Sequence, residues 1–85
     1  LFEISKLELE KFKKRLKLQN IDFFYSKKII DFIAKKSLAF DQGARLVRRN
    51  IQEFVEDKVA REIVEEKIKK NKITLDVKDG KIITV

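Results

Sequence analysis

The sequence predicts an α+β fold, in which a small three-stranded sheet packs against helices in the order α-β-α-α-β-β. Apolar residues recur at three- and four-residue spacing in three stretches, which is typical of amphipathic helices. Three short runs, at residues 21–25, 73–77 and 82–85, are instead rich in β-branched and aromatic residues. At 85 residues, the chain is long enough for one small domain with one modest core.

The first helix is expected to begin at Ser5. Ser5 and Glu8 have the spacing of a capping box, in which the two side chains bond to free backbone N–H groups of the first turn. Three apolar residues then follow on one face: Leu9, Phe12 and Leu16. Lysines and an arginine fill the other faces, so we expect one buried and one solvated side, with the helix ending near Asn20.

A short strand and a second helix are expected next. Residues 21–25 are aromatic and partly alternating, which favours a strand. Ser26 can cap a helix that ends near Ser37. The apolar face of this helix consists of Ile29, Ile30, Ile33 and Ala34.

A third, longer helical pattern covers residues 44–68. Its apolar stripe consists of Val47, Ile51, Phe54, Val55, Val59, Ile63 and Ile68. The charged residues lie mostly off this stripe, as expected for a helix with one buried face. A pattern of about seven turns invites a kink, whose place the sequence does not give.

The chain ends in a predicted β-hairpin. Asp79 and Gly80 lie between two runs rich in β-branched residues, and a type I′ turn needs positive φ at both of its central residues. A two-stranded hairpin is marginally stable alone. We therefore expect residues 21–24 to supply the third strand and the helices to cover the sheet.

The composition excludes several kinds of chemistry. The chain has no Cys, His, Met, Trp or Pro, which rules out Cys or His metal sites, thiol catalysis and disulfides. The net charge is +7, but the lysines are spread along the chain among glutamates, so a nucleic-acid partner is not expected. No run approaches the roughly 20 apolar residues of a membrane span, so we expect a cytoplasmic protein with no membrane partner. Because the sequence begins with Leu1 and not Met, we expect it to be a piece of a longer protein.

The turn into the third helix reads Phe40-Asp41-Gln42-Gly43-Ala44-Arg45-Leu46-Val47-Arg48-Arg49-Asn50-Ile51-Gln52. This segment resembles the sensor-2 segment of the Clp family of AAA+ unfoldases, where Gly-Ala-Arg opens a helix that continues with a basic pair and Ile-Gln. The resemblance extends over essentially the whole chain through the order of its elements. The chain departs from the usual family pattern at Gln42, Leu46 and the neighbourhood of Asp57 and Lys58, where many relatives have an aromatic residue, Pro and Pro.

The resemblance implies that residues 1–85 are the C-terminal small (lid) domain of an AAA+ module of ClpA, ClpB or ClpC type, with a slight preference for ClpA or ClpC. Arg45 would be the sensor-2 arginine, and with Gly43 and Ala44 would form the nucleotide-binding start of the helix. ATP and Mg²⁺ would be bound mainly by the missing large domain, so the parent protein would be an ATPase and the fragment itself not catalytic. The implied partners are neighbouring subunits of a homohexamer, unfolded protein substrates and a peptidase ring.

Other motifs have simpler interpretations. Arg48 and Arg49 could face a partner, but paired basic residues on a helix are usually solvated. The run Phe23-Phe24-Tyr25 could stack RNA bases, although core packing is favoured. The acidic residues Asp76, Asp79, Glu53, Glu56, Glu62, Glu65 and Glu66 could suggest a Mg²⁺ site, but no second element supplies converging ligands.

The chain also has no Gly-x-x-x-x-Gly-Lys-Ser/Thr phosphate loop. The alternative function is a stand-alone basic α/β module that binds RNA or an acidic protein partner.

Overall fold

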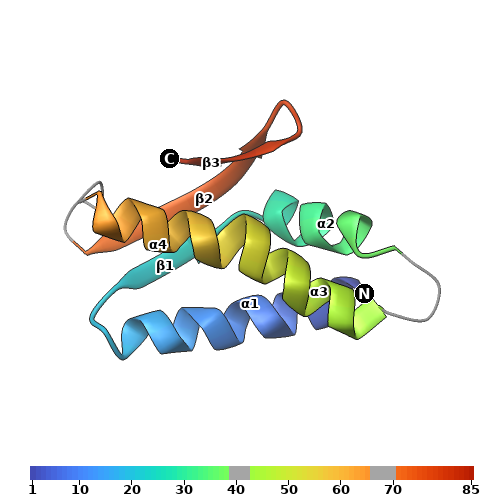
Figure 1. The fold of residues 1–85 in the computed structure, drawn as a ribbon, viewed down its shortest axis with the longest axis horizontal. Coiled ribbons are helices and arrows are strands. Elements are labelled where there is room, and N and C mark those ends of the chain that lie inside the picture. The colour runs from blue at the N-terminus through green and yellow to red at the C-terminus, as the bar shows by residue number, and fades with distance from the viewer. Residues whose placement is uncertain (39–42, 66–70) are drawn as a thin grey trace.

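A computed structural model describes residues 1–38, 43–65 and 71–85 of the chain (Figure 1). The elements in chain order are α1 (Phe2–Lys17), β1 (Asp22–Tyr25), α2 (Lys27–Lys36), α3 (Gly43–Ile51), the π-helical segment η1 (Gln52–Glu56), α4 (Asp57–Val64), β2 (Lys72–Lys78) and β3 (Lys81–Thr84). This order confirms the predicted α+β fold, with α3, η1 and α4 forming the third, long helix.

The sheet has the strand order β1-β2-β3, so the early strand lies beside the C-terminal hairpin as predicted. β1 pairs with β2 in parallel, with Phe23 opposite Ile73, and β2 pairs with β3 antiparallel, with Lys78 opposite Lys81. The two residues of the hairpin turn, Asp79 and Gly80, have φ values of 53° and 74°. Positive φ at both positions is the type I′ geometry, which confirms the prediction made from Asp-Gly.

The first helix begins at Phe2, three residues before the predicted start. The capping-box prediction was wrong because Ser5 is a fully buried residue inside the helix, where its hydroxyl donates to the Leu1 carbonyl at 2.7 Å. A serine in a helix can bond back to the carbonyl four residues earlier, so its spacing from a glutamate does not by itself mark a helix end. The predicted apolar face is correct: Leu9, Phe12 and Leu16 are all buried.

Ser26 is the N-cap residue of α2, as predicted, but its side chain does not cap the helix. The hydroxyl donates instead to Asp76 Oδ1 in β2 at 2.6 Å, and the same carboxylate oxygen accepts the Val77 backbone N–H at 2.8 Å. These two hydrogen bonds, the Ser26 bond first, lower the pKa of Asp76 below its ordinary value of 3.8. The start of α2 is thereby joined to the central strand by a hydrogen bond to an ionised group.

The long helix of residues 43–64 changes its winding in the middle. Val47, Ile51, Val55 and Val59 are at most 2% exposed and form its buried seam. Two other predicted members of this stripe lie differently: Phe54 is half-buried, and Ile63 is 37% exposed near the end of α4. Ile68 lies outside the described residues. The length of the pattern suggested a kink, and the structure shows a change of winding at Gln52–Glu56, a π-helical turn.

One core joins the helices to the sheet. α1 packs against α2, α3 and β1, and α2 packs against β2. The largest fully buried side chains include Phe23 of β1, Leu9 of α1 and Ile29 of α2. Within the described parts of the chain, no helix is long and apolar enough to cross a membrane.

Candidate functional site

Arg45 lies in the first turn of α3 with its side chain exposed. Three of the other arginines, Arg15, Arg48 and Arg49, form ion pairs with glutamates at 3.1–3.4 Å. Arg45 forms no ion pair or hydrogen bond with any residue that the structure describes. Its guanidinium is therefore available to an anion from outside the domain, next to a helix N-terminus whose dipole also favours negative charge.

Gly43 begins α3 where the helix meets the start of the chain. A Cβ atom added to Gly43 would lie 2.7 Å from Cδ2 of Leu1, closer than real side chains approach. The space beside Gly43 is therefore taken by the Leu1 side chain, whose flexible end would have to move to admit a larger residue. Ala44 is exposed, and its side chain has no polar group. The motif residues Phe40, Asp41 and Gln42 lie outside the described part of the chain.

A buried polar pair that sequence reasoning missed fixes α3 against α2. Asn50 Nδ2 donates to Ser37 Oγ at 3.0 Å, and Ser37 Oγ donates to the Ile33 carbonyl at 2.7 Å. Ser37 is fully buried and Asn50 is 9% exposed. Because satisfied polar groups in a core define one arrangement of their neighbours, this pair helps to orient the helix that carries Arg45. The signal in the sequence was a polar residue, Asn50, beside the apolar seam at Ile51.

Arg48 and Arg49 face carboxylates of the same domain. Arg48 Nε lies 3.4 Å from Glu8 Oε1 of α1, and Arg49 Nε lies 3.1 Å from Glu53 Oε1 one turn along the helix. Both arginine side chains are at least 67% exposed, so each pair is worth no more than about 1 kcal/mol. The interpretation of these residues as ordinary surface arginines is thus supported, with Arg48 adding a link between α1 and α3.

The aromatic run of β1 does not form an open stacking platform. Phe23 is fully buried and packs edge-to-face on Phe12, with ring centroids 5.2 Å apart. Core packing is confirmed for Phe23 but wrong for Phe24, which is 41% exposed because successive residues of a strand point to opposite faces. Tyr25 is half-buried and donates to Glu10; burial, and then this carboxylate, raise the pKa of its phenol.

The acidic residues are spread over the surface. Glu53, Glu56 and Glu62 pair with Arg49, Arg15 and Lys58. Asp76 bonds to Ser26, and Glu66 lies outside the described residues. Among the described residues, no three acidic side chains come together as a metal site would require. At the start of α3, the described part of the chain thus offers a phosphate group an exposed arginine beside a helix N-terminus.

The sequence of the chain matches a known protein family. The family model described as the C-terminal, D2-small domain of ClpB protein matches residues 1–77. The chaperone protein ClpB of Prochlorococcus marinus is 36% identical over 82 residues, which cover 95% of this chain and 10% of that protein. The negative regulator of genetic competence ClpC/MecB of Bacillus subtilis is 34% identical over 84 residues, 98% of this chain and 10% of that protein. The chain spans about a tenth of the length of these relatives.

Proposed function

The chain belongs to the family of C-terminal D2-small domains of ClpB proteins, and on that premise we propose that it is the nucleotide-sensing lid of a Clp-type chaperone subunit. Arg45 contacts a phosphate group of ATP that is bound mainly by the large domain of the same subunit. Ala44, which is small and exposed, lets the start of α3 approach that nucleotide, whereas the space beside Gly43 is taken by Leu1. Mg²⁺ accompanies ATP on the large domain and is not held by residues of the lid.

The observation that carries this proposal is the exposed Arg45, which lies in the first turn of a helix of nine residues and has no ion-pair partner among the described residues. A cation at this end of a helix is placed unfavourably with respect to the dipole, so the sequence gains nothing in stability from it. An anion bound there would be stabilised both by the dipole of the helix and by a guanidinium that can hold two phosphate oxygens. Arg45 is therefore better suited to a ligand than to the fold.

The rigid packing of the domain suggests how this contact is used. α3 is tied to α2 by the Ser37–Asn50 pair and to α1 by the Arg48–Glu8 ion pair. A force applied at Arg45 therefore moves the whole domain as one body about the linker to the large domain. In the proposed hexamer, the lid also packs on the next subunit, so loss of the phosphate contact on hydrolysis is passed around the ring to drive the unfolding of protein substrates. Docking of a peptidase ring belongs to the same proposal.

Replacing Arg45 in the intact protein tests the proposal. Arg45→Ala should change the free energy of unfolding of the 85-residue chain by no more than about 0.5 kcal/mol, because the side chain is exposed and unpaired. In the assembled chaperone, the substitution removes a charge-assisted bond worth roughly 1.5 to 3 kcal/mol. ATP turnover and the unfolding of a fluorescent substrate should then fall about ten- to a hundredfold.

Arg49→Ala is the matched control, because Arg49 is an arginine of the same helix with a 70% exposed side chain and an ordinary i,i+4 ion pair. Its ATP turnover and substrate unfolding should stay within about twofold of wild type. Normal turnover and unfolding in Arg45→Ala would refute the sensor role. Unfolding of the isolated chain by the same substitution would instead show that Arg45 is structural.

A further inference from the structure

A groove with an aromatic floor and a basic rim lies on the opposite side of the long helix from α1, between η1, α4 and the hairpin. Its volume is about 270 Å³. This is slightly less than the roughly 300 to 1,000 Å³ of a typical small-molecule pocket, so it suits one side chain of a partner better than a cofactor. The residues that line it include Phe32, Phe54, Ile82, Lys36, Arg61 and Lys81.

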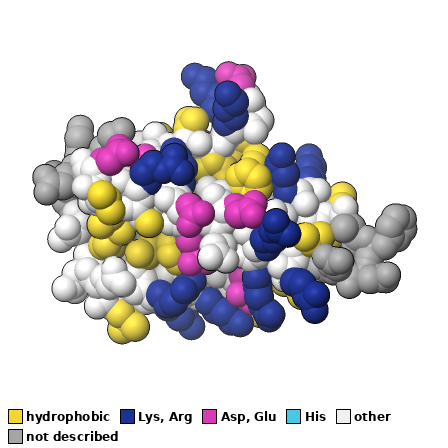
Figure 2. Space-filling view, in the orientation of Figure 1, with side chains coloured by type: hydrophobic (Ala, Val, Ile, Leu, Met, Phe, Trp, Pro, Cys, Tyr) yellow, Lys and Arg dark blue, Asp and Glu magenta, His cyan; other side chains and the backbone are white. Residues whose placement is uncertain are grey.

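The floor of this groove is apolar and only half-buried. Phe32 of α2 and Phe54 of η1 meet edge-to-face, with ring centroids 5.3 Å apart. Ile82 of β3 adds an aliphatic side chain that packs against the core. Figure 2 shows hydrophobic surface between the projecting hairpin and the long helix, with Lys and Arg side chains on either side of it. Phe54 lies on the π-helical segment, a type of irregularity that is frequent at functional sites.

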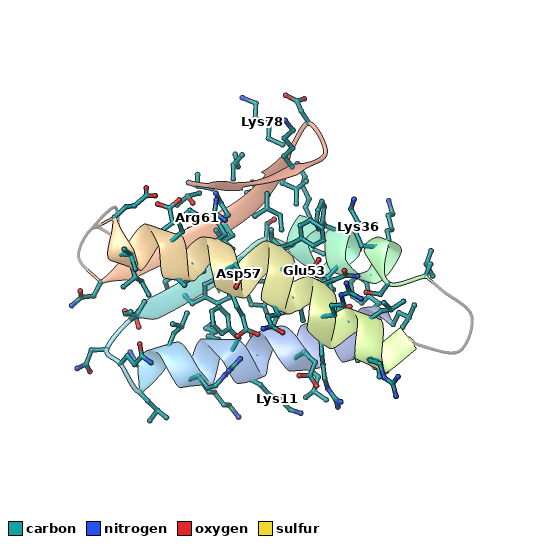
Figure 3. The ribbon with its side chains drawn as sticks, viewed as in Figure 1. Lys11, Lys36, Glu53, Asp57, Arg61 and Lys78 are labelled. Atoms are coloured by element: carbon teal, nitrogen blue, oxygen red, sulfur yellow. The ribbon has the colours of Figure 1, made fainter. Side chains whose placement is uncertain are left out.

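The rim of the groove carries positive side chains that have no ion-pair partner among the described residues. Four positive side chains line the groove against one carboxylate, Glu53, which already pairs with Arg49. Arg61 and Lys81 have no ion pair with the described residues, and the Lys36 ammonium lies over both rings, 5.4 and 5.5 Å from their centroids. In Figure 3, Lys36 and Arg61 lie on either side of Glu53 and Asp57. The free charges flank the apolar floor, so they favour an acidic partner.

We propose that this groove binds an acidic peptide segment of a partner protein, with one aromatic or large aliphatic side chain on the Phe32–Phe54–Ile82 floor and its carboxylates on Lys36, Arg61 and Lys81. A nucleic acid fits the groove less well. Bases need open ring faces to stack on, whereas these two rings contact each other and a lysine.

The test uses the 85-residue chain and a fluorescein-labelled 12-residue peptide in which Asp and Glu flank one Phe, read by fluorescence anisotropy. K36E/R61E should weaken binding at least tenfold. K6E/K14E is the matched control, because it makes the same change in net charge at two exposed lysines of α1 outside this groove, and it should weaken binding less than threefold. Replacing the peptide Phe with Ser at constant charge should also cost about tenfold.

Amide chemical shifts measured by NMR would locate the binding site in the groove if the peptide changes the shifts of Phe54 and Ile82 more than those of α1 residues. Absence of binding, or equal losses in K36E/R61E and K6E/K14E, would overturn the proposal. The proposal would also be overturned if a 12-nucleotide single-stranded DNA bound more tightly than the peptide and K36E/R61E abolished that binding. The groove would then be a nucleic-acid site. A dimer of the chain that dissociates on the same substitution would assign the groove to a second copy and equally reject a peptide.

Discussion

Ser37→Ala should destabilise the domain more than its small change in volume suggests. The Ser37 hydroxyl is fully buried and accepts the Asn50 side-chain N–H at 3.0 Å. The Ile33 carbonyl keeps a partner in the variant, because it also accepts the backbone N–H of residue 37 at 3.1 Å. The group left unsatisfied is the Asn50 amide, and an unpaired buried donor costs about 1 to 3 kcal/mol. For a domain of this size, each kcal/mol lowers Tm by about 4 to 8 °C.

Urea unfolding of the 85-residue chain, followed by circular dichroism, measures this cost. Ser5→Ala is the matched control: Ser5 is also a fully buried serine bonded to a carbonyl four residues earlier, but its hydroxyl accepts no bond from another described side chain. Its loss should cost no more than about 1 kcal/mol, the net worth of one hydrogen bond, because the Leu1 carbonyl still accepts the backbone N–H of residue 5. In a double-mutant cycle, Ser37→Ala combined with Asn50→Leu should be more stable than Ser37→Ala alone, because both polar partners are then gone. A double variant that loses the sum of both single costs would refute the network.

Two further predictions concern the sheet. Gly80→Ala should destabilise the chain by about 1 to 2 kcal/mol, because Gly80 has a φ of 74°, which Ala disfavours. An added Cβ would have no neighbour within 4 Å, so the cost comes from the backbone and not from a clash. Gly80→Asn should cost less in the same urea titration, because Asn tolerates positive φ better than Ala. The depressed pKa of Asp76 implies stability that is present above about pH 4 and is lost as the pH falls through the lower folded-state value. Asp76→Asn should therefore flatten the fall of Tm below pH 4, and an unchanged acid profile would show that the Ser26–Asp76 bond does not favour the ionised form.

The hairpin could be predicted from the sequence because its determinants are local. Asp79 and Gly80 adopt the positive φ values that their residue types favour, whatever packs around them. The start of α1 could not be predicted in this way. Ser5 is buried by tertiary packing, and the helix extends back to Phe2 where Leu1 meets Gly43 of another helix. This boundary involves a contact between segments about forty residues apart, which local spacing does not encode.

In the candidate site, too, features set by local sequence could be predicted and features set by tertiary packing could not. The exposure of Arg45 agrees with the amphipathic count of α3, and its assignment to phosphate came from the resemblance of Gly43-Ala44-Arg45 to a family motif. The Ser37–Asn50 hydrogen bond joins the C-cap residue of α2 to a residue of α3 13 positions later, so it depends on the packing of α2 on α3. Spacing within one helix carries no information about such a pair.

The π-helical segment, by contrast, does have a signal in the sequence. The buried seam residues Val47, Ile51, Val55 and Val59 recur at every fourth position. In an ideal α-helix, with 3.6 residues per turn, such a seam drifts by about 40° per step and about 120° over three steps, which is about the full width of a typical apolar stripe. A helix wound more loosely than α on average brings all four side chains closer to one line toward the core. The π turn over Gln52–Glu56, with its i→i+5 bonds, supplies the extra residue in the middle of the seam. The four-residue apolar period is therefore consistent with looser winding somewhere between Val47 and Val59, and the structure places the π turn, with Phe54 of the groove floor, inside that span.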